Sequence, residues 1–127
     1  DNLITPYIDD GNTHVYYKYA IKIKNKNKTR SQICQAIIDA GFPKTAIAQG
    51  YANIHLLPIF RNKQAYGTSS IPWSLGSRFI DYHKGICPIA ESFHEQELFT
   101  LALNHYDLEE SDAIEISDKI NSIIDNL

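Results

Sequence analysis

The chain has 127 residues, enough for one compact domain with a single hydrophobic core. Hydrophobic residues make up 43% and charged residues 21%, a composition that excludes a disordered or fibrous protein. The net charge of −3 argues against a general affinity for nucleic acid, and the longest apolar runs are too short to span a bilayer. We therefore expect a cytoplasmic protein that binds neither nucleic acid nor membranes.

Residues 13–24 carry the alternation of a β-strand with one buried face. Three lysines fall on one face, and the other face carries five apolar or aromatic side chains, Val15, Tyr17, Tyr19, Ile21 and Ile23. Residues 25–28, Asn-Lys-Asn-Lys, then predict a polar turn. We interpret this basic run as a solvated loop, because no aromatic residues interleave with the charges to stack a base.

A helix with well-marked ends is predicted at residues 29–41. Thr29 can cap the first turn while Gln32, three residues later, reaches back to the cap. Gly41 follows the last turn, and Pro43 prevents the helix from continuing. A short strand is then expected at residues 45–48.

Residues 49–87 lack a clear period and contain prolines, glycines and many aromatic side chains. A long irregular segment of this kind in a compact domain is usually a binding loop or disordered. The aromatic residues favour a binding loop.

Pro88 fits the first position of a second helix, which we expect to end near Gln96. In this helix the inward side chains are expected to be Ile89, Ala90 and Phe93. Glu91, His94 and Glu95 are expected to face solvent or a partner. Residues 97–103 alternate as a strand.

A final amphipathic helix starts between Asp107 and Glu110, with isoleucines at helical spacing. Together these elements predict an α+β fold over a single domain, residues 1–127. We expect a small antiparallel or mixed sheet of about three strands, covered by helices on one side.

Candidate catalytic groups are few. Cys34 and Cys87 are interpreted as buried free thiols, because two cysteines do not make a disulfide framework. Pairing of Cys87 with His83 or His94 as a nucleophile is disfavoured, since no glycine-rich oxyanion loop accompanies it. His83, Cys87, His94 and His105 lack the paired spacings of zinc sites. The residues alone therefore predict no catalytic, cofactor-binding or metal-binding side chain.

Four segments occur in an order that resembles a known family. They are "THVYYKYAIKI", "TRSQICQAIIDAGF", "GYANIHLLPIF" and "CPIAESFHEQELFTLAL", followed by a closing helix. This order is similar to the C-terminal small domain of the DegT/DnrJ/StrS-type aminotransferases, and the resemblance covers nearly the whole chain from about Leu3. The absence of methionine fits a piece of a longer polypeptide.

The resemblance implies a pyridoxal-phosphate enzyme that moves an amino group from glutamate or glutamine to a keto-sugar, often nucleotide-linked. It implies a homodimer with active sites at the subunit interface. The cofactor lysine is implied to lie upstream, in a large domain absent from these residues. Lys84, in "YHKG", is interpreted as a surface lysine, because the glycine-rich stretch that follows the family's lysine is missing after it.

The small domain of such enzymes closes over the cofactor and shapes the substrate entrance. Tyr51 and His55 match the family's substrate-side loop, although Gly50 stands where many members have a histidine. Trp73 lies in a longer insertion and is expected either to stack on a sugar or base or to pack within the loop. The resemblance thus implies Tyr51, His55 and Trp73 as substrate-binding residues.

Two other interpretations remain open. A non-catalytic small-molecule-binding or regulatory module would carry a pocket under its own sheet. A protein-interaction domain would use the acidic C-terminal helix to bind a basic partner, and this binding would weaken with salt. The aminotransferase interpretation instead expects an exposed sheet face or aromatic loop that lacks its natural cover.

Overall fold

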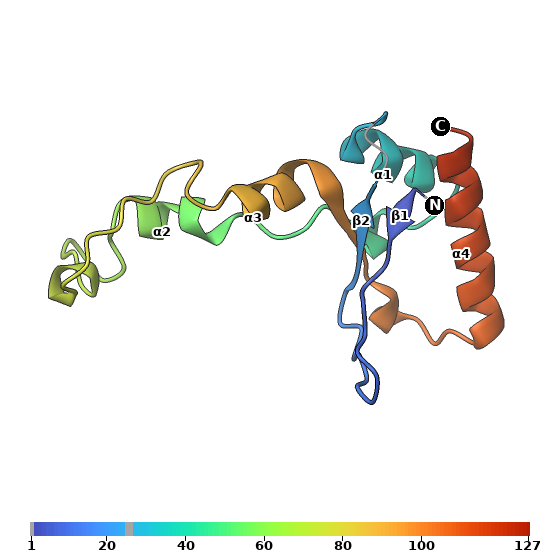
Figure 1. Cartoon of the computed structure of the whole chain (residues 1–127), viewed down its shortest axis with the longest axis horizontal. Helices are drawn as coiled ribbons and strands as arrows, with labels where there is room; N and C mark the ends of the chain where they lie inside the picture. Colours follow the sequence, from blue (N-terminus) through green and yellow to red (C-terminus); the bar gives the residue numbers. More distant parts are fainter. Residues whose placement is uncertain (1, 25–26) are drawn as a thin grey trace. The chain divides into compact units, whose positions relative to one another are not determined.

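The computed structural model describes residues 2–24 and 27–127, which form two compact units (Figure 1). Unit 1 comprises Asp1–Gly50 and Gln96–Leu127, and unit 2 comprises Tyr51–Glu95. Unit 1 holds the sheet and the two longer helices. Unit 2 consists of short helices and loops. The chain therefore leaves unit 1 after Gly50 and returns to it at Gln96.

The sheet of unit 1 has four antiparallel strands in the order β1-β2-β4-β3. Their bounds are β1 (Leu3–Ile4), β2 (Tyr19–Ile23), β3 (Ile47–Ala48) and β4 (Leu98–Leu101). The helices of this unit are α1 (Arg30–Asp39) and α4 (Glu110–Asp125). The predicted α+β class is confirmed. The short edge strand β1 was not among the expected elements.

The hydrophobic core of unit 1 lies between one face of the sheet and the two helices α1 and α4. Residues that alternate along β2 and β4 supply the sheet side, and Ile21 lies opposite Phe99 in the register. The buried members of the core are Ile21, Ile23, Ile33, Cys34, Ile37, Ile47, Phe99, Leu101, Ile120 and Ile124. This core fixes the packing of both helices on the sheet.

Both cysteines are free thiols, as expected, but their surroundings differ. Cys34 is buried in the core, and this burial raises the pKa of its thiol to about 11 even though Arg30 acts to lower it. The Cys34 thiol is therefore protonated near neutral pH and is a poor nucleophile. Cys87 is half-buried at the start of a helix in unit 2.

The strand predicted at residues 13–24 is wrong over its first half, because β2 begins only at Tyr19. Its partner strand β4 ends at Leu101, opposite Tyr19, so no β4 residue lies opposite the earlier residues. The backbone of Tyr16 has a φ of 47°, and its N–H donates to His14 Nδ1 at 2.8 Å instead of joining a sheet. Val15, predicted on the buried face, is 88% exposed.

Helix α1 has the predicted ends. The Thr29 hydroxyl accepts a hydrogen bond from the Gln32 N–H, and the Gln32 side chain accepts from the Thr29 N–H. Gly41 has a φ of 99°, a conformation that glycine adopts at low cost just past a helix. The predicted turn at 25–28 includes residues 25 and 26, which lie outside the described residues.

The strand expected at residues 45–48 is confirmed only for its last two positions, which form β3. The preceding residues Lys44–Ala46 make a 3₁₀ turn, in which the Ala46 N–H donates to the Pro43 carbonyl. Pro43 supplies no N–H of its own and fixes its φ, so the chain turns here before it extends.

Unit 2 contains α2 (Pro58–Arg61) and α3 (Pro88–Ser92). A 3₁₀ turn at Ile54–Leu56 precedes α2, and another at Trp73–Leu75 lies in the loop that joins α2 to α3. Pro88 starts α3 as predicted. A π-helical turn, Phe93–Glu97, then leads into β4. The predicted helix therefore changes its period after Ser92.

The orientation predicted for the helix at 88–96 is wrong in its first turn. Ile89 and Ala90 were expected to face inward, but both are exposed, Ile89 by 73%. Phe93, by contrast, is half-buried and Glu95 is exposed, as predicted. Glu91 was expected to face solvent or a partner and is only 5% exposed. The physical reason is that the Glu91 carboxylate accepts hydrogen bonds from the polypeptide around it, which compensate for the loss of water.

Helix α4 begins at the late end of the predicted range. Glu109 caps it, and the Asp112 carboxylate accepts from the Glu109 N–H at 2.9 Å. Of the isoleucines predicted at helical spacing, Ile120 and Ile124 are buried and Ile116 is half-buried. Neither α4, at 16 residues, nor any other helix in the described part of the chain is long and apolar enough to cross a membrane.

The core of unit 1 predicts a matched pair of substitutions. Ile37→Ala removes a fully buried side chain and should lower the free energy of unfolding by about 2–5 kcal/mol, because it loses buried area and leaves a cavity. Ile114→Ala makes the same chemical change at an exposed position of α4 and should change it by less than about 0.5 kcal/mol. Urea unfolding followed by circular dichroism measures both. Equal losses of unfolding free energy in the two variants would contradict the placement of Ile37 in the core.

Candidate functional site

The most organised polar site in the described residues surrounds the Glu91 carboxylate in unit 2. Its Oε1 lies 2.8 Å from His55 Nε2. The Gly85 N–H donates to both oxygens, at 2.8 and 2.9 Å, and the Cys87 N–H donates to Oε1 at 3.3 Å. Glu91 thus joins the 51–57 loop to the turn that precedes α3.

The electrostatics of this site favour an ionised Glu91. Burial acts to raise the pKa of its carboxyl group, but the hydrogen bonds from Gly85, His55 and Cys87 outweigh burial. Attraction to His55 acts in the same direction, and the pKa of Glu91 falls below its ordinary value. The site is therefore a buried anion stabilised by N–H donors.

The local backbone explains why the donors converge. Gly85 has a φ of 102°, a conformation that other residues rarely adopt, and it lets the chain reverse just before α3. Cys87 is the residue that precedes Pro88, and its side chain makes no capping hydrogen bond. Since no side-chain cap accepts from the N–H groups at the start of α3, the Glu91 carboxylate in its first turn accepts from the Gly85 and Cys87 N–H groups.

The structure places the three predicted substrate-binding residues in different surroundings within unit 2. The side chain of His55 is 11% exposed and is held by Glu91. The ring of Tyr51 is 72% exposed. Trp73 is half-buried and contacts other aromatic residues. His55 and Trp73 therefore belong to separate clusters.

Trp73 is part of an aromatic cluster with Phe60 and Tyr82. The Trp73 and Phe60 rings meet edge to face at 6.0 Å between centroids, and Phe60 lies 5.4 Å from the Tyr82 ring. The Trp73 Nε1–H donates to the Tyr82 hydroxyl at 3.3 Å. This geometry gives Trp73 a role in packing the loop. Its contact with a substrate stays a prediction.

Unit 2, whose residues are all described, has no hydrophobic core of its own. Glu91 is its only fully buried residue. Ten large hydrophobic side chains of this unit are exposed: Tyr51, Ile54, Leu57, Ile59, Tyr66, Ile71, Leu75, Phe79, Ile80 and Ile89. Exposed apolar residues at this density are typical of a surface that another body covers.

Lys84 is confirmed as a surface lysine. Its Nζ makes an ion pair with the Glu95 carboxylate at 2.7 Å, and its side chain is 66% exposed. The hydrogen bond to Glu95 and the charge of Glu95 raise the pKa of Lys84 above its ordinary value. An amine that attacks a cofactor aldehyde must be neutral, and such lysines have lowered pKa values. Lys84 therefore does not fit a cofactor lysine.

Of the other titratable candidates, His83 is placed beside Asp81. His83 Nδ1 lies 3.2 Å from the Asp81 carbonyl and 3.9 Å from the Asp81 carboxylate. In the described part of the chain, no three His, Cys, Asp or Glu side chains gather as a metal ion would require.

Comparison of this chain with family models, with curated proteins and with solved structures finds no match. The resemblance to aminotransferases stays a prediction from the sequence motifs. The Glu91 site could not be predicted from the sequence, because its partner His55 lies 36 residues away. The single available signal was a carboxylate in the first turn of a helix that begins with proline.

Glu91→Gln should release the turn before α3. Glutamine has one acceptor oxygen in place of two, so the Gly85 and Cys87 N–H groups lose part of their charge-assisted bonding. Amide exchange measured by NMR should accelerate about tenfold at Gly85 and Cys87, while unit 1 is unchanged. Glu110→Gln, the same change at an exposed acid of α4 in unit 1, is the control and should leave both amides protected.

The same site predicts a pH dependence. Because the pKa of Glu91 is lower in the folded chain, ionisation of Glu91 stabilises unit 2 fully above its ordinary value of about 4.5. This stabilisation is lost as the pH falls through the lower, folded value. The Gly85 amide signal should follow that titration in NMR spectra, and the Glu91→Gln chain should lack it. A midpoint above 4.5 would show that the carboxylate is not stabilised by its donors.

Proposed function

We propose that this chain is the C-terminal small domain of a pyridoxal-phosphate-dependent aminotransferase of the DegT/DnrJ/StrS type. The enzyme transfers an amino group from glutamate or glutamine to a keto-sugar, which is nucleotide-linked in many members of this family. We further propose that it is a cytoplasmic homodimer. In this assignment, unit 2 supplies part of the substrate entrance.

The observation that carries the proposal is the apolar surface of unit 2. Ten large hydrophobic residues are exposed over 45 positions, while the only fully buried residue is an anion. The order of the sequence motifs implies that a large domain and a second subunit lie nearby in the intact enzyme. Such bodies would cover this surface, as the aminotransferase interpretation requires.

The residues present do not hold the cofactor. Lys84, the lysine whose neighbourhood resembles the family's motif, is charged and ion-paired. Pyridoxal phosphate, which acts as an electron sink for amino transfer, is therefore assigned to the large domain upstream. No step of the transfer is assigned to these residues.

The role proposed for unit 2 is to bind and orient the substrate. The Glu91 carboxylate fixes the ring of His55, and exposed Tyr51 lies four residues before it in the same loop. A flat aromatic ring suits the apolar face of a sugar, and a histidine suits its hydroxyl groups. Trp73 would either position the loop through its contacts with Phe60 and Tyr82 or contact the substrate directly.

A groove in unit 1 favours a second candidate function. It measures about 550 Å³ and lies between α4 and strands β1, β2 and β4, lined by residues such as Leu3, Tyr19 and Ile120. A module that binds a small molecule under its own sheet, without catalysis, would use a cavity of this size. It would not need the apolar surface of unit 2 to be covered.

The two candidate functions make different predictions about the longer protein that contains this segment, because only the aminotransferase would bind pyridoxal phosphate. We expect that protein to be yellow with pyridoxal phosphate, and borohydride should trap the cofactor on a lysine outside these 127 residues. The 127-residue chain alone should neither form this adduct nor turn over substrate. A colourless longer protein, or an adduct on Lys84, would contradict the aminotransferase assignment.

A further inference from the structure

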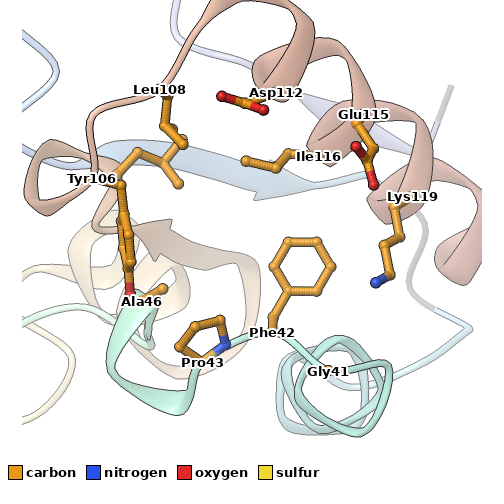
Figure 2. A pocket seen from close by; sticks show the side chains of 11 residues that line it. Gly41, Phe42, Pro43, Ala46, Tyr106, Leu108, Asp112, Glu115, Ile116 and Lys119 are labelled. Carbon is orange, nitrogen blue, oxygen red and sulfur yellow. The ribbon is translucent and has the colours of Figure 1, made fainter.

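A second hollow of unit 1, of about 310 Å³, lies beside the turn that follows α1 (Figure 2). The turn forms one wall, and the segment before α4 together with the first half of α4 forms the other. Its apolar lining residues are Phe42, Pro43, Leu103, Tyr106, Leu108 and Ile116. None of the three predicted substrate-binding residues belongs to it.

The apolar lining is held open by the backbone on both sides. Gly41, with its positive φ, and Pro43 turn the chain so that the Phe42 ring points into the hollow. On the other side, Tyr106 and Leu108 precede α4 and remain 43% and 38% exposed. The chain itself therefore leaves this apolar surface in contact with water, and the volume is that of a small-ligand site.

The rim of the hollow carries charge on α4, from Asp112, Glu115 and Lys119. One Asp112 oxygen accepts from the Glu109 N–H in the helix cap. Lys119 Nζ lies 5.3 Å from the centre of the Phe42 ring. In the structure as described, no hydrogen bond or ion pair engages the Glu115 carboxylate. Glu115 thus offers a carboxylate beside an apolar wall.

The surroundings of the rim are strongly acidic. Residues 107–119 contain six acidic side chains and a single lysine. Charges of one sign around a concave apolar surface raise the local concentration of ions of the opposite sign. The α4 side of the mouth therefore favours cations over anions, while Lys119 on the same helix and Lys44 in the opposite turn reduce the effect.

We propose that this hollow binds a small organic ammonium ion with an aromatic or branched aliphatic body. The body packs against Phe42 and Ile116, and the ammonium group faces Glu115. The ligand needs both an apolar body and a positive charge. An inorganic cation has no apolar body to pack against the lining, and a ligand with a carboxylate would be repelled by the acidic residues of the rim. This site is independent of the aminotransferase assignment, because unit 2 contributes none of its lining.

The test uses three ligands of the same shape and different charge: benzylamine, benzyl alcohol and benzoate. Each is titrated at constant ionic strength into the ¹⁵N-labelled 127-residue chain while NMR follows the amides of 41–46 and 103–119. Benzylamine should bind with a dissociation constant of about 1 mM, given its few heavy atoms. Benzyl alcohol should bind about threefold more weakly, and benzoate more weakly still.

Charge variants on α4 separate this site from non-specific attraction. Glu115→Gln should weaken benzylamine binding about threefold and leave benzyl alcohol unchanged. Lys119→Gln should strengthen benzylamine binding slightly. Glu110→Gln changes an exposed acid of the same helix that does not line the hollow, and it should have less effect than Glu115→Gln.

The proposal is overturned by any of three results. These are shifts that spread over the whole surface, equal losses in Glu115→Gln and Glu110→Gln, or tighter binding of benzoate than of benzylamine. The last result would make Lys119 the group that selects the ligand. A colourless longer protein would contradict the aminotransferase assignment but would leave this site intact.

Discussion

The Glu91 carboxylate accepts hydrogen bonds from His55 and from the Gly85 and Cys87 backbone, and the arrangement of unit 2 depends on this buried anion. The unit has no hydrophobic core, so a charged group with several N–H donors takes the place that apolar side chains take elsewhere. A hydrogen-bond network of this kind restricts the orientation of the backbone and side chains more strictly than apolar packing does, because each N–H donor must point at an oxygen. The loop that carries His55 is thereby tied to the start of α3.

This contact also determines what His55 can offer a ligand. The Nε2 atom of His55 is engaged by Glu91, so Nδ1 is the ring nitrogen that remains to meet a ligand. In the proposed function, Nδ1 would contact a hydroxyl group of the sugar substrate.

The sequence predicted those parts of the fold that depend on neighbouring residues. The Thr29–Gln32 capping box, the turn at Gly41 and the span of α4 all arise from contacts within four residues, and all are found. The parts that failed depend on distant partners. The start of β2 is set by the end of β4, some eighty residues away. The burial of Glu91 depends on His55, 36 residues away, as well as on the nearby Gly85 and Cys87 N–H groups. Helical periodicity alone places an acid such as Glu91 in solvent.

The contrast between the two units bears on how each could function. Unit 1 carries its small apolar hollow beside α4 on elements that share a buried hydrophobic core, so a ligand there meets side chains that the core already positions. Unit 2 exposes many aliphatic and aromatic residues and is held by the Glu91 network and the Phe60–Trp73–Tyr82 cluster, so it has more apolar surface for another body to cover. A substrate loop that is completed only in an assembled enzyme gains selectivity, because its residues adopt the working arrangement only when substrate and neighbouring domains are present. The lack of a core in unit 2 is therefore consistent with a role in substrate entry, and the preformed hollow in unit 1 suits a ligand that binds without assembly.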